Sequence, residues 1–104
     1  MAENHKELEY VRSHLPYRAL LEGLAEECCE LAQAALKMVR AVNGENPTYA
    51  SPDEYREKIA EEAGDVLMVM EVLGIIPGGT TASNPKWGRW VFRIKERSNS
   101  KGGC

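Results

Sequence analysis

The spacing of the apolar residues is the feature that most constrains the fold of this chain. In residues 16–42 and again in residues 52–73 they recur in steps of three and four, as along the buried side of an α-helix. The first stripe is Leu20, Leu21, Leu24, Cys28, Leu31, Ala35, Met38, Val39 and Val42, and the second is Ile59, Ala63, Val66, Val69, Met70 and Leu73. No segment shows the strict alternation of a half-buried strand. The sequence therefore predicts an all-α protein.

Capping residues divide the chain into four predicted helices. These helices span residues 3–14, 16–42, 52–73 and 86–98. Pro16 suits the first turn of the second helix, and Gly44 follows its end. Ser51 is the predicted N-cap of the third helix, Glu54 is its capping-box partner, and Gly74 follows the last residue.

The chain has 104 residues, which predicts one domain over residues 1–98 and a disordered tail over residues 99–104. A helical domain this small buries a thin core, so we expect the bundle to be completed by oligomerisation. There is no apolar run long enough for a bilayer and no signal peptide, which predicts a cytoplasmic protein without a membrane partner. The net charge of −3 argues against a polymeric nucleic acid as partner.

A near-repeat lies 35 residues apart in the middle of the two long helices. The segment Ala25-Glu26-Glu27-Cys28-Cys29-Glu30-Leu31 is echoed by Ala60-Glu61-Glu62-Ala63-Gly64-Asp65-Val66. Because each helical residue turns about 100°, Glu27 and Glu30 lie about 60° apart on one side of their helix. Glu62 and Asp65 have the same relation on the next helix.

These paired acids are candidate metal ligands. Glu27 and Glu62 fall at the edges of the buried stripes, where an unpaired charge costs several kcal/mol. A hard divalent cation with oxygen ligands would offset that cost and the mutual repulsion. The alternative is an ordinary solvated acidic surface, but a second copy in the same register favours a site. Glu26 and Glu61 lie further from the stripes.

The last predicted helix is basic and aromatic. Lys86, Arg89 and Arg93 could offset the charge of a phosphate group, or they form an ordinary solvated basic face. Trp87 and Trp90 are expected to pack in a core or subunit interface rather than to stack on a base. Among the three cysteines there is no zinc-site spacing, and Cys28 is interpreted as a small core residue.

At the repeated acids the chain resembles the MazG-like, all-α nucleoside triphosphate pyrophosphohydrolases. Their hallmark is ExxE on one helix and ExxD on the next, matched here by Glu27-x-x-Glu30 and Glu62-x-x-Asp65. The resemblance covers about residues 17–95 and also includes Glu62-Ala63-Gly64-Asp65-Val66-Leu67. It implies a four-helix MazG-like bundle that works as a homodimer or homotetramer.

The resemblance also implies a reaction. A nucleoside triphosphate would be hydrolysed to the monophosphate and pyrophosphate, with magnesium or manganese held by Glu27, Glu30, Glu62 and Asp65. Glu30 or Glu26 is then the candidate general base, and Lys86, Arg89 and Arg93 are the candidate phosphate contacts. Two alternatives stay open. One is a narrower relative acting on dUTP, dCTP or phosphoribosyl-ATP, and the other is a non-catalytic oligomeric helical module.

Overall fold

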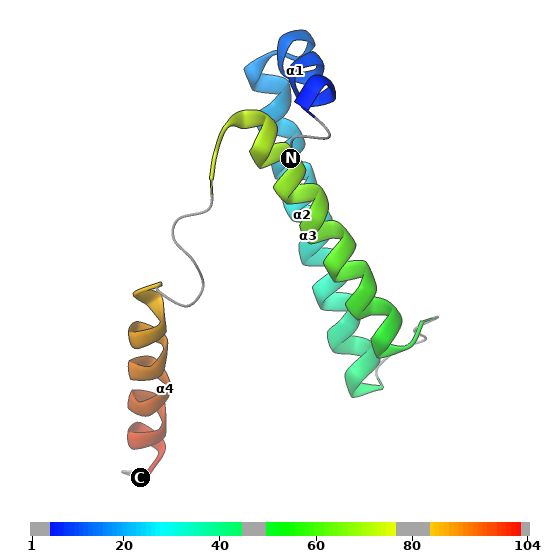
Figure 1. Cartoon of the computed structure of the whole chain (residues 1–104). Coiled ribbons are helices and arrows are strands. Elements are labelled where there is room, and N and C mark those ends of the chain that lie inside the picture. The colour runs from blue at the N-terminus through cyan, green and yellow to red at the C-terminus, as the bar shows by residue number, and fades with distance from the viewer. Residues whose placement is uncertain (1–4, 45–49, 77–83, 103–104) are drawn as a thin grey trace.

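The computed structural model describes residues 5–44, 50–76 and 84–102, and these ranges contain four α-helices and no strand (Figure 1). The helices are α1 (His5–His14), α2 (Tyr17–Asn43), α3 (Pro52–Leu73) and α4 (Lys86–Gly102). The prediction of an all-α protein is therefore confirmed. In the described ranges no helix combines the length and the apolar character that crossing a bilayer requires.

Helix α2 is the longest element, with 27 residues and a length of about 40 Å. It begins directly after Pro16, whose backbone is extended (φ −67°, ψ 153°) and whose carbonyl accepts a hydrogen bond from the Leu20 N–H at 3.2 Å. Pro16 is therefore the N-cap, one position before the first helical residue, and not part of the first turn as the sequence predicted. The helix ends at Gly44, which has a φ of 68° that residues with a side chain rarely adopt.

The limits of α3 are set by local hydrogen bonds that the sequence predicts. The Ser51 hydroxyl accepts a hydrogen bond from the backbone N–H of Glu54 at 3.2 Å, and Pro52 is the first helical residue. Gly74 ends the helix in the left-handed conformation, with a φ of 73°. Both ends of α3 are confirmed.

The two long helices form an antiparallel hairpin, and α1 packs at its open end (Figure 1). Arg12 of α1 donates from Nε to the carbonyl of Val72 at 2.9 Å and from Nη2 to the carbonyl of Glu71 at 3.2 Å. These carbonyls belong to the last turn of α3, whose carbonyls lack the usual donor within the helix, and the carbonyl of Glu71 also accepts from the Gly74 N–H at 3.0 Å. Arg12 therefore ties α1 to the C-terminal end of α3.

Helix α4 contacts none of the other three described helices (Figure 1). It is capped by Asn84, whose Oδ1 accepts from the Lys86 N–H at 2.9 Å. It continues to Gly102, so residues 99–102 are helical where the sequence predicted a disordered tail, and residues 103 and 104 lie outside the described ranges. One chain thus does not close the predicted four-helix bundle, and the single domain over residues 1–98 stays a prediction.

Few apolar side chains are buried within one chain. Among the described residues, only Leu20 and Ala34 are buried apolar residues, and the stripe on α3 is half-buried. Cys28 is exposed, so its interpretation as a core residue is wrong for the single chain. The reason is geometric: α2 packs only against α3, which leaves most of its circumference uncovered.

Candidate metal centre

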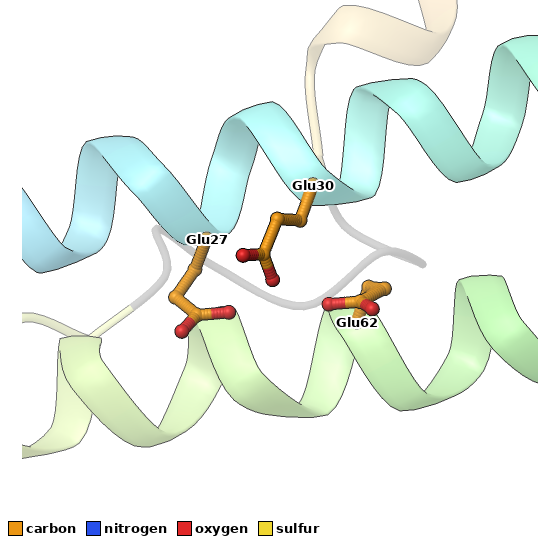
Figure 2. A group of neighbouring side chains, drawn as sticks. All are labelled: Glu27, Glu30 and Glu62. Atoms are coloured by element: carbon orange, nitrogen blue, oxygen red, sulfur yellow. The ribbon is translucent and has the colours of Figure 1, made fainter.

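Three carboxylates meet between α2 and α3. Glu27 and Glu30 lie one turn apart on α2, and Glu62 approaches them from α3 (Figure 2). One oxygen from each of these residues lies within 4.8 Å of the others. We call Glu27, Glu30 and Glu62 the carboxylate cluster. The spacing of three residues predicts that Glu27 and Glu30 share a side of α2, and the packing of the hairpin adds Glu62.

Asp65 lies one turn beyond Glu62 on α3 and is half-buried. It forms a second close group with Glu61 and Glu62, again with one oxygen from each residue within 4.8 Å of the others. Asp65 is also near enough for its charge to act on Glu27. Glu62 is therefore the residue shared by both groups, and all four predicted ligands lie in one region of the hairpin.

Glu62 is the buried centre of this region. The residue is 5% exposed, and its Oε2 atom is buried without a hydrogen-bond partner among the described residues. The Oε2 atom of Glu27 is in the same situation. Buried polar atoms are normally hydrogen-bonded, and burying a charge without compensation is costly. Two buried oxygens without a hydrogen-bond partner among the described residues, on carboxylates of one cluster, therefore favour a bound cation.

The electrostatics of Glu27 agree with this interpretation. Burial of the carboxyl group raises its pKa, and the neighbouring charges of Glu30, Asp65 and Glu62 raise it further. All of these causes disfavour the ionised form. A cation at the cluster would reverse the effect, because it stabilises the carboxylate over the carboxylic acid.

Lys58 is the counter-ion of the cluster. Its Nζ atom lies 3.1 Å from Oε1 of Glu62 and 3.8 Å from Oε1 of Glu61. The hydrogen bond to Glu62 and the charge of Glu61 raise the pKa of Lys58. The sequence analysis missed this residue, although its position four residues before Glu62 is the signal of a helical ion pair.

A cavity of about 350 Å³ adjoins the cluster between α2 and the start of α3. Glu30 and Glu62 belong both to the cluster and to the cavity wall. The rest of the lining is Gln33, Ala34, Lys37, Ala50, Glu54, Tyr55 and Lys58. The cavity thus joins the acidic cluster to two lysines and one aromatic ring.

The two candidate bases differ in their surroundings. Glu30 is exposed and belongs to the cluster, so its carboxylate is both close to the other acids and accessible to water. Glu26 is exposed but belongs to neither close carboxylate group among the described residues. Of these two candidates, Glu30 therefore lies in the cluster and Glu26 does not.

The predicted phosphate contacts lie elsewhere in the chain. Lys86, Arg89 and Arg93 line a separate hollow on α4 together with Trp90. Trp87 and Trp90 stack with ring centroids 5.7 Å apart, and they are 51% and 59% exposed. Because α4 contacts no other described helix, one chain does not bring these cations to the carboxylate cluster.

No family model matches the chain, and neither the curated proteins nor the solved structures yield a match.

Proposed function

We propose that this protein is a MazG-like nucleoside triphosphate pyrophosphohydrolase that depends on magnesium, with manganese as a substitute. The observation that carries the proposal is the carboxylate cluster, above all the buried Oε2 of Glu62, which has no hydrogen-bond partner in the part of the chain that the structure describes. The paired ExxE and ExxD motifs supply the link from a cation site to this reaction.

The residues present fit a hard divalent cation. Magnesium takes oxygen ligands at about 2.0–2.1 Å, so two opposite ligands lie about 4.2 Å apart. One oxygen from each residue of the cluster lies within 4.8 Å of the others, so side-chain rotations would have to draw these oxygens together around the cation. Glu27, Glu30 and Glu62 would hold the cation, and Asp65 would complete the site from the adjacent turn of α3.

The reaction consumes one water molecule and breaks the anhydride link between the α- and β-phosphates, yielding a nucleoside monophosphate and pyrophosphate. A bound divalent cation would neutralise phosphate oxygens and lower the pKa of water. Glu30 would accept the proton of the attacking water, and its exposure and its membership of the cluster support this role. Glu26 is the second candidate for this role.

The proposal includes a homodimer or homotetramer. The large apolar side chains of α4 are 48–64% exposed in the single chain. These side chains are Trp87, Trp90, Val91, Phe92 and Ile94. Large exposed apolar patches are typical of protein interfaces. In an oligomer, α4 of one copy could bring Lys86, Arg89 and Arg93 to the phosphates bound by another copy.

The test is the release of pyrophosphate from a panel of nucleoside and deoxynucleoside triphosphates, with magnesium, with manganese and with chelator. We expect release only with a divalent cation, and we expect Glu62→Gln to abolish it. Release from dUTP, dCTP or phosphoribosyl-ATP alone would indicate a narrower enzyme. No release from any of these nucleotides would refute the proposal and favour a non-catalytic helical module.

A further inference from the structure

The cavity beside the carboxylate cluster holds two cationic side chains from different helices. Lys37 comes from α2 and has no ion-pair partner among the described residues. Lys58 comes from α3 and is paired with Glu62, which the proposed function assigns to the metal. These lysines lie in the same cavity as Glu30 and Glu62, whereas the cations of α4 do not.

Lys58 is placed to exchange partners when a metal binds. Its ammonium group contacts the Oε1 atom of Glu62 at 3.1 Å, so a cation that binds this carboxylate competes directly with Lys58. The side chain of Lys58 is 51% exposed and has room to move. Repulsion from the metal would turn the ammonium group from the cluster toward the cavity that Lys58 already lines.

The charge of the cavity then suits a phosphate chain. With Glu30 and Glu62 bound to a metal, the other charged residues of the lining are the two lysines, Lys37 and Lys58, and one acid, Glu54. Lysine ammonium groups bind phosphate oxygens through charge-assisted hydrogen bonds. A phosphate chain can thus bridge the metal and the two lysines.

The uncharged residues of the cavity lining suit the nucleoside. Tyr55 is half-buried and offers an aromatic surface, and Ala34 and Gln33 on α2 add an apolar and an amide group. The volume of about 350 Å³ lies within the range of small-molecule sites, which is about 300–1,000 Å³. An aromatic ring beside cations is a suitable environment for a base that is linked to phosphates.

We infer that this cavity is the nucleotide-binding pocket, in which Lys37 and Lys58 bind the phosphate chain and Tyr55 packs against the nucleoside. The inference rests on the proposed function, and it names residues that the ExxE and ExxD motifs do not include. It also assigns Lys58 two successive partners: Glu62 in the metal-free protein and phosphate in the complex.

The test is calorimetric binding of a nucleoside triphosphate analogue with a methylene group between the α- and β-phosphorus atoms, in the presence of magnesium. We expect Lys37→Met and Lys58→Met each to weaken binding by at least about tenfold, as the loss of a charge-assisted hydrogen bond predicts. The matched control is Lys6→Met on α1, a residue outside the cavity, which should change binding less than about twofold.

Two further measurements separate the parts of the inference. Inorganic triphosphate should lose affinity in both lysine variants but not in Tyr55→Leu, whereas the nucleotide analogue should lose affinity in all three. Manganese binding without nucleotide, followed by electron paramagnetic resonance, should be retained or strengthened in Lys58→Met because a competing cation is gone. Circular dichroism establishes that each variant is helical.

The outcomes distinguish this inference from the proposed function. If the wild type binds and hydrolyses nucleotides while Lys37→Met and Lys58→Met bind the analogue as the wild type does, the pocket is wrong and the enzyme assignment stands. If the wild type binds manganese but neither binds the analogue nor releases pyrophosphate, both are wrong. Normal binding in Lys58→Met with a loss in Lys37→Met would refute the exchange of partners by Lys58.

Discussion

Replacing Glu62 by glutamine distinguishes the role of Glu62 in metal binding from its role in the stability of the fold. The substitution keeps the size of a residue that is 5% exposed and removes its charge. It loses the ion pair with Lys58, which is worth little because the lysine is half-exposed. It relieves repulsion with Glu27 and Glu30, and the introduced amide can donate to one of their carboxylates, a gain of about 1.5–3 kcal/mol.

We therefore expect metal-free Glu62→Gln to be at least as stable as the wild type. A net gain of about 1 kcal/mol would raise the melting temperature by about 4–8 °C in a domain of this size. Magnesium, in contrast, should stabilise the wild type more than the variant. At a concentration of about 100 times its Kd it stabilises the wild type by about 2.7 kcal/mol, and a hundredfold weaker site in the variant would reduce this to about 0.4 kcal/mol.

The assay is a pair of thermal melts for each protein, with magnesium and with chelator, followed by circular dichroism. Glu57→Gln is the matched control, since Glu57 is an exposed acid on the same helix that belongs to neither carboxylate group. An equal magnesium shift in Glu62→Gln and the wild type would refute the assignment of Glu62 as a ligand. A metal-free variant several degrees less stable than the wild type would refute the account of its burial.

Three other predictions address the site, the assembly and the helix ends. The pKa of Glu27 is raised in the folded state, so the metal-free protein should lose stability as the pH rises above 4.5, the ordinary pKa of the group. The urea midpoint of Glu27→Gln should fall less with rising pH than that of the wild type. Parallel pH profiles for the two proteins would contradict the prediction. Light scattering should give a multiple of 11.6 kDa, and a monomeric mass in dilute solution would contradict the proposed oligomer. Ser51→Ala should destabilise the chain by about 1 kcal/mol in urea unfolding, because the Glu54 N–H loses its acceptor, and an unchanged midpoint would show that this cap contributes nothing.

The ends of the helices were the part of the fold most open to prediction from the sequence. Ser51 and Gly74 act through backbone hydrogen bonds and dihedral angles within a few residues, so the local sequence is enough to predict their effect. The end of α4 was not predicted correctly from the sequence. Nothing between residues 98 and 102 forbids a helix, and α4 continues through them. A polar composition alone did not mark the end of that helix.

The carboxylate cluster was predicted in part, because helical spacing fixes which acids share a side but not which helices face each other. Glu27, Glu30 and Glu62 come together as the amphipathic stripes require. The place of Arg89 relative to them depends on how α4 packs, which no local pattern encodes. Cys28 shows the same limit. An apolar stripe predicts which side of a helix is suited to packing, but it does not predict which element packs there, and Cys28 is exposed.

The carboxylate cluster lies far from the ends of both long helices, and this position limits which changes of length the chain can tolerate. Glu62 is the eleventh residue of α3, and Glu27 is the eleventh of α2. One residue inserted between Ser51 and Glu62 would turn that carboxylate by about 100° relative to the cap, away from its partners on α2. An insertion between Asn43 and Ala50 would leave the rotational position of the acids on both helices unchanged. Relatives of this chain should therefore differ in the length of that connection while keeping a constant number of residues from each helix start to its acids.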